Sequence, residues 1–461
     1  MRDEPTVPLP LSQALGIADA WQQQGRFAEA AVLLDRILGV APRHPVALHL
    51  RGLVAFRLGQ PEAAARLVER ALAEGGEEQL FLRNLCSIYE RLGRYPEAIA
   101  AGERAAVLDP LDTAALLNLS VVHYRRLDLD AASACARAAI GIDPSAAGPH
   151  FALAEALLLQ GAFAAGWEEY EWRFRIPGTS APLPAALAQR GQPEWDGRPL
   201  PGGRLLLVAD QGFGDSIQFC RYIPWAAARC AALALACSPE LRPLLAQVAP
   251  SAALFTRWEE APTFDAWCPL SGLPRRHGTR LQNIPAGTAY LRAEPARVAA
   301  WRARLQARSP RGTRLVGLVW AGRPEHVNDA NRSASLAAFA PLADLPGVSL
   351  VSLQRGPAHG QVGAYHGRAP LLALGPEIAD FADTAAILAC LDVLVSVDTS
   401  VAHLAGALGV PAWVLLPYAP DWRWLLGRAD TAWYPSLRLF RQPAPLDWHP
   451  VVAELAAALA G

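Results

Sequence analysis

The sequence contains no lysine, so all 42 of its basic side chains are arginine. This absence excludes a Schiff-base lysine, a G-x-x-x-x-G-K-[ST] phosphate-binding loop and the strand lysine of protein kinases. Codon bias in a GC-rich genome explains it most simply, given the excess of alanine, arginine, proline and glycine. Whatever its origin, any anion must be held by arginine, histidine, hydroxyl groups, backbone N–H groups or a metal.

Other features are missing as well. The best apolar stretch, residues 385–397, is interrupted by Asp392 and is too short to span a bilayer. The seven cysteines form no C-x-x-C pair, and the N-terminus lacks the charged and apolar regions of a signal peptide. The net charge is −1 with both signs interspersed, which disfavours a nucleic-acid partner. We therefore expect a cytoplasmic protein without a membrane span, in which the cysteines stay reduced.

A repeat dominates the first part of the 461 residues, a length that suggests about three domains. Two series of mostly small residues recur every 34 residues: Ala30, Ala64, Ala98 and Ala132, continued by Gly166, and Gly25, Gly59 and Gly93, continued by Leu127 and Gly161. This period, with small residues where two helices touch, is that of the tetratricopeptide repeat. We expect four full repeats and a fifth that merges into the next domain, forming a superhelix that holds a peptide or protein segment. A purely structural or dimerising array is the alternative.

From Arg204 onward, short apolar runs alternate with helical stretches. The runs expected to form buried parallel strands are RLLLVAD, ALALAC, AALFTR, FDAWCPL, RLVGLVWAG, VSLVSLQ, DVLVSVD and PAWVLLP. An arginine-rich stretch over residues 293–314 divides them into two α/β units. Because ligands of open parallel sheets bind beyond the carboxyl ends of the strands, the loops after these runs are the candidate site.

The first such loop, residues 211–216, follows RLLLVAD. It resembles a dinucleotide fingerprint, but Ile217 stands where the third glycine would be, so the fingerprint fails. Gly212 and Gly214 would let the backbone approach a substrate, and Asp215 would lie at a helix N-terminus facing the cleft. Its carboxylate is either a general base for a hydroxyl nucleophile or an acid that only complements the helix dipole.

Two further loops carry polar side chains. The loop over residues 320–333, beginning at Trp320, contains two arginines and a histidine and is either an anion clamp or a solvated loop. Gln354, after another strand, could read a base or sugar edge or could cap a turn.

The fourth loop is the most informative. A strand ends at Asp398, Thr399 and Ser400 begin the next helix, and His403 follows one turn later. Hydroxyls together with the free N–H groups of a helix start form a site for a pyrophosphate. A buried structural histidine is the alternative, but polar groups packed into an apolar crossover are costly unless they are used.

The segment D-T-S-V-A-H-L-A-G-A-L-G-V-P at residues 398–411 resembles the donor-site motif of the heptosyltransferase-like glycosyltransferases, a family with two Rossmann domains (GT-B type). The resemblance extends to G-F-G-D at residues 212–215 and covers residues 204 to 461. With the repeat array in front, the chain resembles bacterial tetratricopeptide proteins that carry such a transferase domain, some of them implicated in glycosylating flagellin or other proteins.

The resemblance implies roles for particular residues. It makes Asp215 the base that deprotonates an acceptor hydroxyl, and it places Asp398, Thr399, Ser400 and His403 at the diphosphate or ribose of a nucleotide sugar. Arg332 occupies the place of a basic residue, often lysine, in the family, and Pro224 comes later than the family's proline after the G-D motif. These departures leave the donor sugar open. The resemblance also implies an inverting reaction with a nucleotide sugar as co-substrate and with neither a metal nor another cofactor.

The expected function is transfer of a sugar to a serine or threonine hydroxyl of a protein, flagellin-like for example, presented by the array. Two alternatives remain: a non-catalytic scaffold with a degenerate nucleotide-sugar domain, and a saccharide-directed enzyme of the lipopolysaccharide-core type. The expected donor-binding residues are Arg332, Gln354, Asp398, Thr399, Ser400 and His403, beside a cleft loop of Gly212, Gly214 and Trp320. The segment over residues 421–424 is expected to close this cleft, where Trp320, Trp422, Trp424 and Trp433 either stack on a base or sugar or pack in the core.

The expected fold is an α-solenoid of tetratricopeptide repeats followed by an α/β region with two Rossmann-like domains of GT-B type. Its expected limits are a tail over residues 1–12, the array over 13–178, a junction over 179–203, an acceptor-side domain over 204–300 and a donor domain over 301–461.

Overall fold

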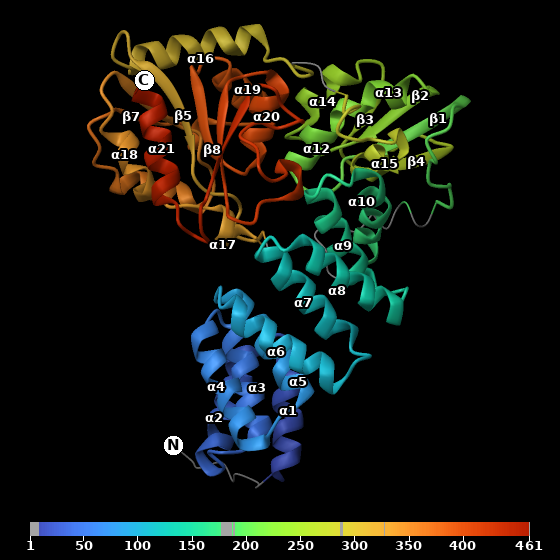
Figure 1. Cartoon of the computed structure of the whole chain (residues 1–461). Helices are drawn as coiled ribbons and strands as arrows, with labels where there is room; N and C mark the ends of the chain where they lie inside the picture. Colours follow the sequence, from blue (N-terminus) through green and yellow to red (C-terminus); the bar gives the residue numbers. More distant parts are fainter. Residues whose placement is uncertain (1–8, 177–186, 188–189, 286–288, 327, 461) are drawn as a thin grey trace, which may run out of the picture. The chain divides into compact units, whose positions relative to one another are not determined.

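The computed structural model of the chain describes residues 9–176, 187, 190–285, 289–326 and 328–460. The chain separates into two compact units, Met1–Ala156 and Leu157–Gly461, which are coloured blue to teal and teal to red in Figure 1. Within the described residues, no helix combines the length and the apolar character needed to cross a membrane.

The repeat array consists of paired helices with short turns. Their bounds are α1 (Leu11–Gln23), α2 (Phe27–Val40), α3 (Pro45–Arg57), α4 (Pro61–Gly75), α5 (Gln79–Arg91), α6 (Tyr95–Leu108), α7 (Thr113–Arg125), α8 (Leu129–Ile142), α9 (Ala147–Leu159) and α10 (Phe163–Tyr170). The first four pairs are the four full repeats, and the pair α9 and α10 continues into the second unit.

The two 34-residue series have distinct structural roles. Ala30, Ala64, Ala98 and Ala132 are completely buried, because a larger side chain would hold the paired helices apart. The other series ends the first helix of each pair in the left-handed region, where glycine is unstrained. Gly25 has φ +77°, and Leu127, which replaces glycine in the fourth repeat, still adopts φ +62°. The turn is therefore imposed by the packing of the repeat as well as by glycine.

The second unit contains two parallel sheets, as expected. The first has the strand order β3-β2-β1-β4, and the second has the order β10-β9-β8-β5-β6-β7. The strand bounds are β1 (Leu200–Val208), β2 (Cys230–Ala236), β3 (Ala253–Phe255), β4 (Ala266–Pro269), β5 (Arg314–Val319), β6 (Val348–Ser352), β7 (Leu371–Ala373), β8 (Val393–Val397), β9 (Ala412–Leu416) and β10 (Leu437–Arg441). The apolar runs anticipated eight of these strands, whereas β7 and β10 were not anticipated.

Helices cover both sheets. The α-helices are α12 (Phe213–Phe219), α13 (Ile223–Ala227), α14 (Arg242–Val248), α15 (Leu273–His277), α16 (Pro295–Arg308), α17 (Asp329–Arg332), α18 (Ala340–Ala343), α19 (Phe381–Leu388), α20 (Ser400–Leu408) and α21 (His449–Ala460). The 3-10 segments are η1 (Glu171–Arg175), η2 (Cys220–Tyr222), η3 (Trp258–Glu260), η4 (Leu270–Gly272), η5 (Leu336–Phe339), η6 (Pro357–Ala364), η7 (Gly375–Glu377) and η8 (Trp422–Trp424). One face of the six-stranded sheet buries its apolar residues against α21 through Val452 and Leu455.

The expected domain limits stay predictions. Helix α1 begins at Leu11, inside the expected tail, and α16 runs across the expected limit between residues 300 and 301. Residues 179–186, 188 and 189 of the expected junction lie outside the described residues. The rest of the junction is packed: Trp195 is buried, and its backbone N–H donates to Trp267 O at 2.7 Å, beside β4.

Candidate functional site

The two loops with the strongest motifs meet although they follow strands of different sheets. The loop after β1 leads into α12, the loop after β8 leads into α20, and these two helices pack against each other. Gly214 in α12 lies directly against His403 in α20, where a Cβ atom would fall 2.8 Å from His403 Cδ2. Glycine is therefore required at 214 for the two helices to approach this closely.

Asp215 is the third residue of α12 and caps the start of that helix. Its Oδ2 accepts a hydrogen bond from Gly212 N at 3.0 Å. Its Oδ1 accepts from Nη2 of Arg423, which belongs to η8 in the six-stranded part. Both carboxylate oxygens are thus engaged, the first by the helix start and the second by an arginine 208 residues further along the chain.

Arg423 is buried and holds several acceptors at once. Its Nη1 lies 2.9 Å from both carboxylate oxygens of Asp421, and its Nε donates to Gln218 Oε1 at 2.5 Å. Burial lowers the pKa of Arg423, but Asp421 and Asp215 together raise that pKa well above its ordinary value. Segment 421–424 therefore joins the two sheets, because Asp215 and Gln218 come from the four-stranded side.

His403 is enclosed by aromatic groups. Its Nδ1 is 2.9 Å from the hydroxyl of Tyr434, and its ring stacks on Trp424 with a centroid distance of 5.3 Å. Burial and the charges of Arg423, Arg221 and Arg332 lower the pKa of His403 well below its ordinary value. The imidazole is therefore neutral near pH 7.

Asp398 lies at the end of β8, buried, with Oδ1 3.8 Å from His403 Nε2. That separation is too long for a hydrogen bond. Burial first and the charge of Asp421 second raise the pKa of Asp398 to about 6, against the opposing effect of Arg332. A carboxyl group with such a pKa can take up or release a proton near neutral pH.

Thr399 and Ser400 begin α20. Thr399 is the N-cap residue and is nine-tenths buried, and its Oγ1 is 3.1 Å from Ser396 Oγ. Because Ser396 Oγ donates to Val397 O at 2.7 Å, Thr399 is the donor in the contact with Ser396. Thr399 does not cap the helix through its side chain, so the first N–H groups of α20 have no partner from that hydroxyl.

Arg332 ends the short helix α17, and its side chain is 17% exposed. Its Nε lies 3.4 Å from Asp329 Oδ1, and its guanidinium group packs so closely on Gly322 that a Cβ there would fall 2.6 Å from Nη2. The charge of Arg332 affects the pKa of both Asp398 and His403. The loop after β5 thus brings a cation to the start of α20.

The structure places Gln354 and Trp320 differently from the expected cleft. Gln354 Oε1 accepts from Trp320 N and Ala321 N at 3.0 Å, and its Nε2 donates to Ala321 O at 3.0 Å and Arg355 O at 2.9 Å. These four bonds use the full capacity of the amide and favour the turn-bracing alternative. Trp320 is completely buried in the core of the six-stranded sheet, so its ring lines no cleft.

The remaining candidate tryptophans also pack internally. Trp422, Trp424 and Trp433 are at most 2% exposed. Trp422 contacts the edge of Trp167 in α10 with a centroid distance of 5.1 Å. Core packing, and not stacking on a ligand, is therefore the role of these side chains in this structure.

Sequence reasoning missed the roles of Arg423 and Tyr434. Arg423 in D-W-R-W reads as a local partner of Asp421, and no local pattern shows that it reaches Asp215. Tyr434 lies in none of the sequence motifs, and only the fold brings its hydroxyl to His403. Within the described part of the chain, histidine, cysteine and acidic side chains form no group of three arranged to hold a metal ion.

The comparisons with known proteins support the repeat array. The tetratricopeptide repeat family matches residues 15–77, 49–113 and 87–147. Protein FlbA of Caulobacter vibrioides is 29% identical over 507 residues, covering 96% of this chain and 83% of FlbA. The N-terminal part of the chain is an array of tetratricopeptide repeats, and the chain as a whole is similar to FlbA.

Two solved structures similar to the chain each cover about a third of it. PilF of Pseudomonas aeruginosa is 18% identical, covers 37% of this chain and 78% of its own, and has a TM-score of 0.34. MamA is 18% identical, covers 36% of this chain and 94% of its own, and has a TM-score of 0.32.

Proposed function

We propose that the chain is a glycosyltransferase of the GT-B type that moves a sugar from a nucleotide-sugar donor to a serine or threonine hydroxyl of a protein. One observation carries the proposal: the G-F-G-D loop and the D-T-S-V-A-H segment lie against each other through Gly214 and His403. Both segments resemble the heptosyltransferase-like pattern, and they come from the carboxyl ends of two different parallel sheets, where α/β proteins bind ligands.

The proposed reaction needs a proton acceptor and a stabilised leaving group. The acceptor oxygen forms a bond to the anomeric carbon, its proton passes to Asp215, and the bond from that carbon to the diphosphate oxygen breaks with its electron pair. The start of α20 at Thr399 and Ser400, together with Arg332, supplies positive charge for the departing diphosphate without a metal ion. Asp398 and His403 line the same helix start and orient the nucleotide sugar.

A non-catalytic scaffold that binds a nucleotide sugar is the second candidate. It is favoured by the engagement of Asp215, because both of its oxygens already accept hydrogen bonds. Under the first proposal, the acceptor hydroxyl either uses a second lone pair of an Asp215 oxygen or displaces Arg423 or Gly212 from it. The two candidates therefore differ in whether Asp215 can still accept a proton from an acceptor hydroxyl.

The deciding experiment incubates the full chain with a panel of nucleotide sugars and follows the release of nucleoside diphosphate by chromatography. Peptide and protein acceptors are added in parallel and their masses are measured. Turnover that falls in Asp215→Asn but not in Asp447→Asn, an exposed aspartate, supports the transferase. Absence of turnover with every donor, together with saturable donor binding, supports the scaffold.

A further inference from the structure

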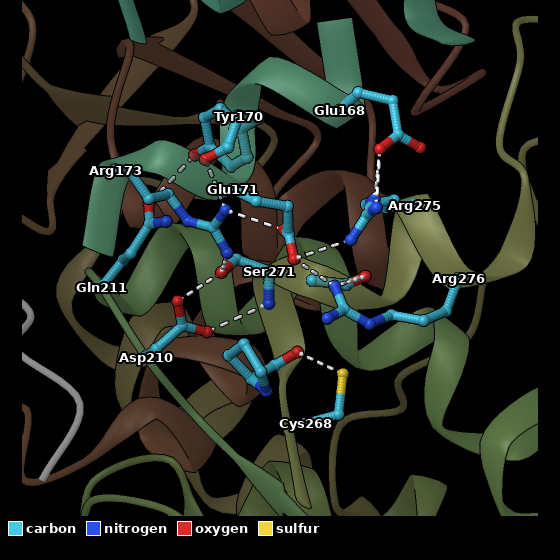
Figure 2. Close-up of polar contacts among 12 residues, drawn as sticks. Glu168, Tyr170, Glu171, Arg173, Asp210, Gln211, Cys268, Ser271, Arg275 and Arg276 are labelled. Atoms are coloured by element: carbon cyan, nitrogen blue, oxygen red, sulfur yellow. Dashed lines mark hydrogen bonds and ion pairs between the residues drawn. The ribbon is translucent and has the colours of Figure 1, made fainter. Parts of the chain in front are cut away.

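The helical segment over residues 163–175, formed by α10 and η1, belongs to the array by its repeat period and packs on α9 through Gly166 and Leu158, but it also contacts the α/β part. It lies in the second unit and contacts the loop that follows β1 through Tyr170 and Gln211. Figure 2 shows its side chains Tyr170, Glu171 and Arg173 directed at Gln211, Ser271 and Arg276 of the four-stranded part. The segment is therefore a structural component of the α/β unit.

Arg173 reaches the end of β1 through a serine. Its Nη2 donates to Ser271 Oγ at 2.5 Å, and Ser271 Oγ in turn donates to Asp210 Oδ2. The same carboxylate accepts a hydrogen bond from Ser271 N at 3.0 Å, through Oδ1. Asp210 is buried, which raises its pKa, while Arg173 acts to lower that pKa. Asp210 thus depends on Arg173 and Ser271 for its hydrogen bonds and its charge balance.

Tyr170 holds the next residue of the same loop. Its buried hydroxyl donates to Gln211 Oε1 at 3.2 Å, and burial raises the pKa of Tyr170 to about 12, so the hydroxyl stays a donor. Gln211 adopts φ +62°, a left-handed conformation that is strained for a residue with a side chain. A contact that fixes this side chain also fixes the turn that leads to Gly212 and Asp215.

The segment also packs on the partner of Asp215. Trp167 and Tyr170 contact the ring of Trp422 at centroid distances of 5.1 and 6.0 Å, and Trp422 directly precedes Arg423. Both ends of the Asp215–Arg423 ion pair are therefore supported by the same short segment. Ion pairs on α15 anchor it further, through Glu168 with Arg275 and Glu171 with Arg276.

We propose that Tyr170 and Arg173 are positioning residues of the proposed transferase site: they fix the turn over residues 210–212 and thereby the carboxylate of Asp215. The inference rests on the proposed function for its catalytic consequence, whereas the holding of the loop is a property of the fold. Neither side chain has to touch a substrate. The last helices of the array are in this way part of the proposed transferase site in the α/β unit.

The test uses the full-length chain in three versions: Arg173→Lys, Tyr170→Phe and the control Arg175→Lys. A lysine cannot reproduce the planar set of donors of Arg173, and phenylalanine removes only the hydroxyl of Tyr170. Arg175 is an exposed arginine of the same segment, whose guanidinium group packs on Trp172. Hydrogen exchange of the amides over residues 209–219 is measured first.

In both positioning variants, the amides of this loop are expected to exchange about tenfold faster than in the wild type. This factor corresponds to the loss of one buried hydrogen bond, and exchange in the control is expected to stay unchanged. With a nucleotide sugar that the wild type turns over, kcat is expected to fall about tenfold at nearly constant donor KM, because α20 is untouched. If Arg173→Lys does not fold, the result for Tyr170→Phe alone tests the positioning role.

The possible outcomes distinguish the inference about Tyr170 and Arg173 from the proposed transferase function. Unchanged exchange in the loop overturns the inference regardless of activity. Faster exchange with unchanged kcat also overturns it, because the loop position then has no effect on turnover. A wild type that turns over no donor contradicts the proposed function, and faster exchange in the variants then supports the holding of the loop alone.

Discussion

Arg423 donates through Nη2 to Asp215 Oδ1 and through Nη1 to Asp421, so one buried guanidinium group joins two carboxylates from different parts of the fold. Asp215 follows β1 of the four-stranded sheet, whereas Asp421 and Arg423 follow β9 of the six-stranded sheet. The pair connects the two α/β parts at the point where the motifs meet. It also bears on the proposed catalysis, because an acceptor hydroxyl would have to share an oxygen of Asp215 with Arg423 or Gly212, or displace one of them.

Arg423→Gln should therefore destabilise the chain markedly. Removing the arginine leaves two carboxylates facing each other without their shared cation, and loss of one partner of a buried pair costs about 3–5 kcal/mol. The matched control is Arg428→Gln. Arg428 pairs with Asp430 two residues away, as Arg423 pairs with Asp421, but Asp430 is largely exposed. That pair is worth less than about 1 kcal/mol. Urea unfolding compares the two variants, and equal losses of stability would contradict a buried role for Arg423.

Gly214→Ala tests whether the close approach of α12 and α20 is needed. A Cβ atom at 214 would fall 2.8 Å from His403 Cδ2, so the helices must separate or His403 must rotate away from Trp424. Overpacking of this kind costs about 1–3 kcal/mol. At Gly360, by contrast, a Cβ would meet nothing within 4 Å. We expect lower stability and lower donor turnover for Gly214→Ala only, measured by thermal unfolding and nucleoside diphosphate release.

Gln354→Leu distinguishes a structural glutamine from a donor contact. The substitution leaves three backbone groups of the loop after β5 without their partner, Trp320 N, Ala321 N and Ala321 O, together with Arg355 O in the loop after β6. Each unsatisfied buried group costs about 1–3 kcal/mol, although water can replace part of the loss. The expected result is reduced thermal stability, with no such change for Gln282→Leu at an exposed position. A raised donor KM at unchanged stability would instead make Gln354 a ligand contact.

Local patterns predicted the fold well because the signals are themselves local. The 34-residue period gives the array, and eight apolar runs give eight parallel strands. The strands that were missed, β7 and β10, are the two edges of the six-stranded sheet, and length does not explain the miss because β3 is as short as β7 and was anticipated. Trp320 could have been assigned to the core, since Val316, Leu318 and Trp320 alternate along β5 and beyond it and share one buried face. No such signal exists for Arg423 with Asp215, or for Tyr170 with Gln211, because those pairs form only when distant segments pack together.

Asp398 should leave a signature in the pH dependence of stability. Its pKa is about 6 in the folded chain, compared with about 3.9 for an unfolded aspartate, so between these values the folded state binds more protons. Stability therefore falls as the pH rises from 4 to 6. In Asp398→Asn this loss is absent, so the variant should gain about 3 kcal/mol relative to the wild type across that range.

His403, whose pKa is lowered, is present in both proteins and contributes in the opposite direction. Urea unfolding at several pH values provides the measurement, with Asp447→Asn as the exposed control. A difference between wild type and Asp398→Asn that does not change with pH would place the pKa of Asp398 near its ordinary value.

Deleting the repeats tests whether the acceptor is a protein segment or a saccharide, and the structure shows at which residue the deletion should end. A deletion of residues 1–175 would remove Phe163, Trp167 and Tyr170, which cover Trp422, and would also remove Arg173 from Ser271. Such a chain should unfold at lower denaturant concentration or aggregate, since each aromatic side chain lost from a core costs about 3–5 kcal/mol. Its inactivity would therefore say nothing about the acceptor.

A deletion of residues 1–146 instead removes the four full repeats and keeps α9 and α10. This shorter deletion is expected to unfold cooperatively and to retain donor hydrolysis, because every contact described around Asp215 and His403 remains. If the acceptor is a protein segment held by the array, transfer to that protein should fall strongly while hydrolysis persists. Transfer to the protein that persists without the repeats would contradict presentation by the array, and transfer to a saccharide in place of the protein would favour the saccharide-directed alternative, because a sugar hydroxyl needs only the α/β unit.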